Sequence, residues 1–152
     1  TVWELSARLP LPGALERDTL VVARGAAGVL PLEGHRWVEP LRDSIPARLA
    51  TDLARLRGAG LVWLSPAPSG VNVARRLRVE IDTLLADEAR RTLRLRARWW
   101  FTDALPAASR TPFPTPATAD IDIALPDGAV DTLAVAHRLA IWRLARRITG
   151  AP

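Results

Sequence analysis

The clearest hydrophobic pattern of the chain lies between Arg75 and Phe101, where apolar and polar residues alternate in two successive runs. The first run has its apolar positions at Leu77, Val79 and Ile81. The second run alternates apolar residues with three arginines, Arg94, Arg96 and Arg98. A period of two is typical of strands with one buried face, so the two runs predict a β-hairpin connected through residues 86–89.

The two arms of this hairpin constrain each other's register, because facing residues must share one side of the sheet. One allowed register places Glu80 opposite Arg96 and Asp82 opposite Arg94. Opposite charges in such positions stabilise a pair of strands by roughly 0.2–1 kcal/mol each. We therefore expect an outer face on which the arginines are partly neutralised by carboxylates.

Two other stretches repeat apolar residues every three or four positions, which predicts amphipathic helices. The first runs from Pro40 to Gly58, and its interior Pro46 predicts either a kink or a later start at Ser44. Its apolar stripe is Leu41, Ile45, Leu49, Leu53 and Leu56, with Arg42, Arg48, Asp52, Arg55 and Arg57 off the stripe. The second helix is expected to be capped by Asp127 and ended by Gly150. Its apolar stripe is Val130, Leu133, Ala134, His137, Ala140, Ile141, Leu144 and Ile148.

Shorter apolar runs predict the remaining strands. They are Val2–Arg8, Thr19–Ala23, Val29–Leu32, Leu61–Leu64 and Ala119–Leu125, with a turn at residues 24–28. Pro31 and the alternating Asp120 and Asp122 favour edge positions for two of them. We expect an α/β fold that borders on α+β. A single domain over residues 1–152 would hold a mixed, mainly antiparallel sheet of about six strands, covered by two amphipathic helices.

The composition excludes several classes of protein. The chain has no cysteine, which excludes disulfides, thiolate catalysis and zinc–thiolate sites. It has no lysine, which excludes the Walker type of nucleotide hydrolase, and we interpret the use of arginine alone as a codon bias of a GC-rich genome. No apolar run approaches the roughly 20 residues that cross a bilayer, and the first ten residues do not predict a signal peptide.

Candidate catalytic residues are few. His35 and His137 lie in different predicted elements and lack a metal-ligand spacing, so we interpret His137 as a hydrogen-bonded core or rim residue and His35 as a loop residue. Asp120 and Asp122 share one strand face and could form an acid/base pair, which is the last-ranked hypothesis. We expect no enzyme activity, no metal and no cofactor.

The net charge of +5 raises the alternative of a nucleic-acid-binding module that uses the Arg94, Arg96 and Arg98 face. Binding to single strands usually also needs stacking aromatic residues on the same face. Here only Trp100 falls on the same side of the strand as the arginines, whereas Trp99 and Phe101 fall on the apolar side. We favour a solvated, ion-paired face and expect no nucleic-acid partner.

The most distinctive segment is Gly34–Leu41, which reads Gly-His-Arg-Trp-Val-Glu-Pro-Leu. By itself it is typical of a helix entry, with Pro40 in the first turn. Trp and Arg are also frequent anchors of protein interfaces, so a subunit contact is the alternative. The candidate contact residues of this segment are Arg36, Trp37, Glu39, Pro40 and Leu41.

This segment resembles the PqiC-like family of ABC-type transport auxiliary lipoproteins, in which an Arg-Trp-x-Glu-Pro-Leu run opens a Leu-rich helix. Two further stretches are similar to that family: Leu9-Pro10 followed by residues 15–22, and the hairpin arms 78–82 and 93–99. Val38 stands where a small residue is expected. The resemblance spans Leu9 to Ile148.

The resemblance implies a periplasmic, non-catalytic accessory lipoprotein, usually anchored in the outer membrane. Its partners would be an MCE-domain lipid-transport protein with its membrane components, and further copies of itself. The lipid anchor would lie upstream of Thr1.

Overall fold

The computed structural model describes residues 1–7, 19–23, 29–36, 41–105, 112–127 and 129–150, and only the backbone of 19–23, 29–36, 41–43 and 130. These residues form seven strands and two helices. The strands are β1 (Trp3–Leu5), β2 (Thr19–Ala23), β3 (Val29–Arg36), β4 (Val62–Leu64), β5 (Arg75–Asp87), β6 (Thr92–Asp103) and β7 (Ala117–Ala124). The helices are α1 (Leu41–Arg57) and α2 (Val130–Thr149).

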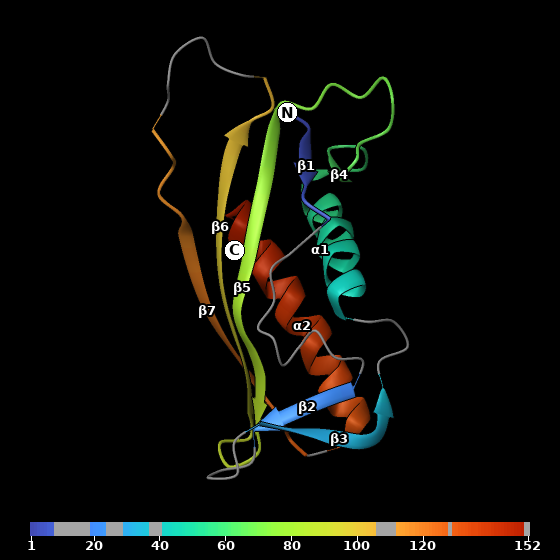
Figure 1. Cartoon of the computed structure of the whole chain (residues 1–152), viewed down its shortest axis with the longest axis vertical. Helices are drawn as coiled ribbons and strands as arrows, with labels where there is room; N and C mark the ends of the chain where they lie inside the picture. Colours follow the sequence, from blue (N-terminus) through green and yellow to red (C-terminus); the bar gives the residue numbers. More distant parts are fainter. Residues whose placement is uncertain (8–18, 24–28, 37–40, 106–111, 128, 151–152) are drawn as a thin grey trace.

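All seven strands join one mixed sheet around the long strand β5 (Figure 1). One edge of β5 pairs antiparallel with β6, which in turn pairs antiparallel with β7. The other edge is shared: β1 runs parallel to the start of β5 and β2 runs parallel to its end. Beyond them lie β4 and β3. The predicted fold class is confirmed, with seven strands in place of about six, and β3 and β7 are edge strands as predicted.

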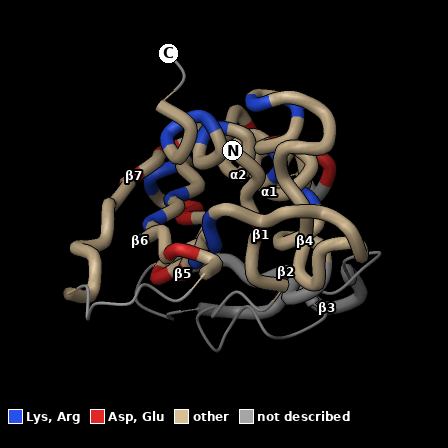
Figure 2. Tube along the Cα trace, turned by 90° about the horizontal axis from the view of Figure 1, so that it is seen from above, with Lys and Arg blue, Asp and Glu red and all other residues tan. Residues whose placement is uncertain are grey.

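Both helices cover the same face of the sheet (Figures 1 and 2). Helix α2 packs on β6 and β7, and α1 packs between α2 and β4. The strands point alternate residues into this layer, so that Leu5, Leu77, Leu93 and Leu95 are fully buried. From the helices, Leu49, Leu53 and Leu144 meet them in one apolar core. On the second face, β6 and β7 present exposed charged side chains to water.

The predicted hairpin register is wrong, because the turn lies further along the chain than expected and β5 also carries a bulge. Glu80 lies opposite Arg98, and the pairing resumes with Thr83 opposite Arg96, which leaves Asp82 without a ladder partner. A bulge adds one residue to one strand and reverses which side the following residues face. Leu84 and Ala86 therefore point inward beyond the bulge. The strands also run further than expected, and the turn is Glu88–Arg91 in place of 86–89.

The helix ends follow local backbone chemistry, with two departures from expectation. Helix α1 begins before Ser44 and continues through Pro46. Of the two expected alternatives, the one with Pro46 in the helix interior is therefore correct. The N-cap of α2 is Ala129, not Asp127, although Asp127 Oδ1 accepts a hydrogen bond from the Ala129 N–H at 2.9 Å. Gly150 ends α2 with φ of 72°, a left-handed conformation that glycine adopts without a steric penalty. The predicted turn at 24–28 lies outside the described residues.

Asp52 was expected off the buried stripe of α1, and the structure places it inside, with 2% of its surface exposed. The helix is covered from two directions, by α2 and by β4, so the buried arc is wider than one stripe. Burial raises the pKa of Asp52 above its usual range, and the charges of Arg48 and Arg55 oppose this rise. The Oδ2 atom of Asp52 has no hydrogen-bond partner within the described part of the chain.

Replacing Asp52 with Asn should stabilise the protein at neutral pH. A carboxyl group whose pKa is higher in the folded state adds stability only below its unfolded pKa, and that stability is lost as the pH rises through the folded pKa. We expect Asp52→Asn to raise the unfolding free energy by about 1–2 kcal/mol near neutral pH and by little in acid. Urea denaturation at both pH values measures this. The control is Asp103→Asn at an exposed position, which should leave the unfolding free energy unchanged at both pH values. A destabilised Asp52→Asn protein would contradict the assignment.

A substitution in the apolar core should change the free energy of unfolding more than Asp52→Asn does. Leu95 is fully buried beneath α2, so Leu95→Ala removes apolar contacts and leaves a cavity. We expect a loss of about 2–5 kcal/mol in the free energy of unfolding, measured by urea denaturation. The control is Leu105→Ala, at a side chain that is 80% exposed, and it should be nearly neutral.

Candidate interaction surface on the outer face of the sheet

The water-exposed face of the sheet carries a network of ion pairs along three strands. Arg94 on β6 donates from Nε to Asp122 Oδ1 on β7 at 3.1 Å, and the same Nε lies 3.6 Å from Asp120 Oδ1. Arg96 Nη2 donates to Asp120 Oδ2 at 3.1 Å. The antiparallel register of β6 and β7 places these side chains directly opposite each other. Each arginine therefore has a carboxylate partner on the neighbouring strand.

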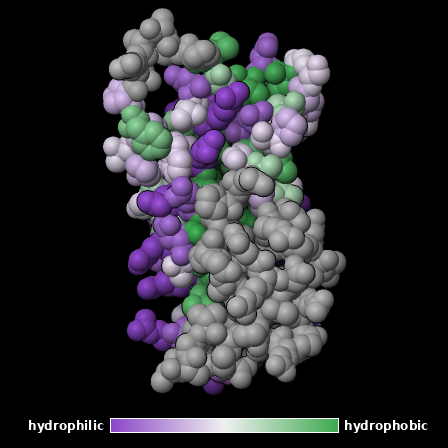
Figure 3. Space-filling view, in the orientation of Figure 1, coloured by the Kyte–Doolittle hydropathy of each residue, from purple (hydrophilic) through white to green (hydrophobic). Residues whose placement is uncertain are grey.

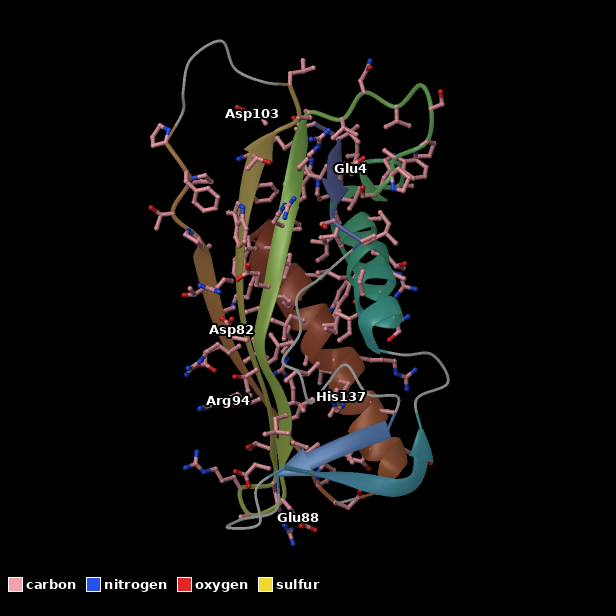
Figure 4. The ribbon with its side chains drawn as sticks, in the orientation of Figure 1. Glu4, Asp82, Glu88, Arg94, Asp103 and His137 are labelled. Carbon is pink, nitrogen blue, oxygen red and sulfur yellow. The ribbon has the colours of Figure 1, made fainter. Side chains whose placement is uncertain are left out.

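The third arginine turns to the opposite neighbour, β5. Arg98 Nη2 donates to Glu80, its cross-strand partner, and Arg98 Nε lies 3.3 Å from Asp82 Oδ2. The bulge at Asp82 brings this second carboxylate within reach of the same guanidinium. Figure 4 shows Asp82 and Arg94 on the sheet side of the molecule, and His137 on α2.

Carboxylates slightly outnumber arginines on this face. Three arginines, Arg94, Arg96 and Arg98, face four carboxylates, Glu80, Asp82, Asp120 and Asp122. The hydrogen bond and charge of Asp122, with a smaller effect of Asp120, raise the pKa of Arg94. Exposed pairs of this kind contribute little stability, but they hold side chains in a fixed pattern. A neutralised face is a poor site for a polyanion, so the geometry argues against the nucleic-acid alternative.

The sequence predicted this solvated, paired face correctly but assigned two of the partners wrongly. It paired Arg94 with Asp82 and Arg96 with Glu80 along one hairpin. The structure uses Asp120 and Asp122 of β7 instead, which also accounts for the two aspartates proposed as an acid/base pair. Which strand lies beside β6 is a property of the whole sheet, and alternation within one hairpin contains no information about it.

The distinctive segment lies elsewhere. Arg36 is the last residue of β3 and Leu41 is the first residue of α1, while Trp37, Glu39 and Pro40 lie outside the described residues. In the sheet, β3 is separated from β6 by β2 and β5. The structure therefore places Arg36 and Leu41 apart from the arginines of the outer face.

The histidines and carboxylates form no common centre in the described part of the chain. His137 is buried on α2, where its Nδ1 lies 2.7 Å from the Leu133 carbonyl oxygen, which confirms a hydrogen-bonded core residue. Burial lowers the pKa of His137, and this hydrogen bond opposes the effect. His35 belongs to β3, not to a loop as expected. No group of three metal-ligating side chains exists among the described residues.

A shallow groove of about 470 Å³ lies between α1 and the edge strand β4. Its walls are mostly small or apolar, with Ala50, Ala54 and Trp63, and Arg55 is the charged residue that lines it. No histidine or carboxylate side chain of the described residues lines this groove, and these are the groups that most often perform acid/base chemistry or bind metals.

The sequence did not predict an aromatic cluster at the end of the sheet where β5 begins. The rings of Trp3 and Phe101 contact each other in a tilted arrangement, with their centroids 4.6 Å apart. Arg57 lies over the Trp3 ring at 3.6 Å and Arg75 lies over the Phe101 ring at 4.4 Å. Burial and the charge of Arg75 lower the pKa of Arg57. The alternation in the sequence placed Trp3 and Phe101 on the apolar side of their strands, which predicted burial. Their contact with each other depends on β1 and β6 lying on the two edges of β5.

Fold and surface together define a protein with one mixed sheet, two helices on one face and an ion-paired outer face. The model of the ABC-type transport auxiliary lipoprotein component family matches residues 7–149, and the chain belongs to this family. That family places it on the periplasmic side of the cell envelope. None of the described helices is both long and apolar enough to cross a membrane.

Solved structures share the fold. A Xanthomonas campestris protein of the DUF330 family superposes with a TM-score of 0.73 at 10% identity, over 98% of this chain and 81% of its own. An uncharacterized protein superposes with a TM-score of 0.70 at 11% identity, over 97% of this chain and 88% of its own. No curated protein sequence matches the chain.

The burial of His137 predicts a pH dependence of stability. Its pKa is lower in the folded state, so the unfolded chain takes up the proton first, and stability falls as the pH drops below the unfolded value of about 6.5. We expect the parent protein to lose more stability than His137→Gln between neutral pH and about pH 5.5, as measured by urea denaturation. Equal losses in the two proteins would show that His137 does not titrate in this way.

Proposed function

We propose that this protein is a non-catalytic accessory component of an MCE-type intermembrane lipid-transport system. The family match over residues 7–149 carries the proposal, because the family serves ABC-type transport. Within that system the chain would act as one domain that docks other components. It would be held at the outer membrane by a lipid on a residue upstream of Thr1.

The outer face supports a docking role. Its arginines and carboxylates are held by ion pairs across three strands, so a partner would meet a fixed charge pattern that needs little ordering on binding. Paired charges of alternating sign favour recognition of a complementary pattern over strong attraction to any one sign. The proposed contact residues are Arg94, Arg96 and Arg98, together with Arg36, Trp37, Glu39, Pro40 and Leu41 of the distinctive segment.

Further copies of the chain are the second proposed partner. Among the described residues, the strands β3, β4 and β7 end the sheet and have one edge each without a strand partner. A head-to-tail contact between unlike surfaces closes into a ring when the rotation allows it. Ring assembly is thus a proposal that the mass of the purified protein in solution tests.

Co-purification with the MCE-domain protein of the same organism tests the docking role. The sharpest variant exchanges one ion pair, Arg96→Asp with Asp120→Arg, which keeps the pair and the net charge but reverses the pattern shown to a partner. We expect the parent chain to co-purify and the exchanged variant to bind at least tenfold more weakly, a loss of about 1.4 kcal/mol.

Arg90→Gln, in the β5–β6 turn, is the control and should bind like the parent. Unfolding by urea checks that the exchanged variant is folded. A parent chain that stays monomeric and binds no MCE-domain protein would refute the proposed function. Unchanged binding of the exchanged variant would remove the outer face from the contact.

A further inference from the structure

We propose that the end of the molecule where β5 begins binds the surface of an anionic lipid bilayer. This aromatic end consists of the apolar residues Trp3, Trp100, Phe101, Leu105 and Phe113 and the basic residues Arg57, Arg75, Arg76 and Arg78. It lies at the upper end of the view in Figure 4, where Glu4 and Asp103 are labelled, and the Glu88 turn lies at the other end.

The first observation is exposed apolar surface. Leu105 is 80% exposed and Phe113 is 69% exposed, the two highest values among the large hydrophobic residues of the described chain. Both belong to the connection between β6 and β7. Phe113 contacts the Trp100 ring, with centroids 5.6 Å apart. Figure 3 shows hydrophobic atoms reaching the surface at this end among hydrophilic ones. Large apolar side chains held in water between two strands favour contact with a nonpolar phase.

The second observation is basic charge beside these residues. Arg78 is the cross-strand partner of Trp100, and Arg76 lies opposite Thr102. The Arg76 side chain is 59% exposed, with Glu4 Oε1 at 3.6 Å from its Nε. The ion pairs among the described residues include neither Arg75 nor Arg78. Four arginines thus face two carboxylates here, Glu4 and Asp103, whereas on the outer face four carboxylates face three arginines.

The combination fits a bilayer surface better than a soluble polyanion. Tryptophan and arginine both favour the lipid–water interface, since each has an apolar body and a polar end. Anionic headgroups attract the guanidinium groups, while Leu105 and Phe113 can enter the acyl region. A single-stranded nucleic acid can stack a base on Phe113, but it has no apolar interior for the aliphatic side chain of Leu105, which it would leave in water.

The position of this end agrees with the proposed anchor. Thr1 lies at the same end (Figure 1), and its carbonyl oxygen accepts a hydrogen bond from Arg57. A lipid attached upstream would hold this end near the membrane. This step alone rests on the proposed function, and the arginines and exposed apolar residues stand without it.

Vesicle co-sedimentation tests the proposal on the chain as it is. We expect binding to vesicles of phosphatidylglycerol mixed with phosphatidylethanolamine, weakened by salt, and little binding to phosphatidylcholine vesicles. Arg76→Gln with Arg78→Gln should lower the partition coefficient about thirtyfold. The matched control is Arg90→Gln with Arg91→Gln, which removes the same charge from the opposite end and should change binding only slightly. Equal weakening by the two pairs would show attraction by net charge alone and overturn the proposal.

The apolar contribution has its own pair of variants. Leu105→Ser with Phe113→Ser should weaken binding about tenfold or more. Val135→Ser with Leu139→Ser, at exposed apolar positions of α2, should not. If the Leu105 and Phe113 variant binds as well as the parent, the surface recognises anionic charge without a bilayer interior, and the proposal fails.

Direct insertion can be measured because the chain contains no cysteine. Leu105→Cys provides a single site for an environment-sensitive fluorophore, and Arg90→Cys provides the same probe at the opposite end. We expect a blue shift on adding anionic vesicles at residue 105 and none at residue 90. Shifts at both sites, or at neither, would overturn the assigned orientation. Failure of these tests leaves docking to the MCE-domain protein to be decided separately by co-purification.

Discussion

Strand β5 is the constraint on which the rest of the structure depends, because its edges hold three other strands at once. β6 covers one edge along its whole length, and β1 and β2 divide the other edge between its start and its end. The inward residues Leu77, Val79, Ile81 and Leu84 are each at most 3% exposed beneath the helices. The bulge at Asp82 divides β5 into a first part that pairs with β1 and a second part that pairs with β2. It changes which residues of β5 face the core from one part to the other.

The same geometry separates two kinds of surface. In the middle of the outer face three strands run side by side, so each arginine meets a carboxylate across the ladder and is ion-paired. At the aromatic end the strands terminate, and Arg75 and Arg78 have rings beside them and no carboxylate within ion-pair distance in the described chain. A patterned, ion-paired face suits recognition of a protein, whereas a basic end with exposed apolar residues suits a lipid surface.

The candidate surface could be predicted in part. Alternation placed Arg94, Arg96 and Arg98 on the exposed side and indicated that carboxylates neutralise them. It could not identify Asp120 and Asp122 as partners, because the neighbour of β6 is decided by the order of the whole sheet. Asp52 was missed for a related reason: a helical stripe shows one buried side, and α1 is covered from two. The contact roles of Trp37, Glu39 and Pro40 stay predictions, since these residues lie outside the described part of the chain.

The sequence by itself determined the elements: a period of two predicted the hairpin strands, shorter apolar runs predicted the other strands, and a period near four predicted the two helices. These patterns are local, because a residue's tendency to be buried depends on its own side chain and those two to four positions away. Only the tertiary structure decided the hairpin register, the division of β5 between β1 and β2, and the meeting of Trp3, Phe101 and two arginines at one end. Those contacts join residues far apart in sequence, and their free energy exists only when the whole sheet has formed.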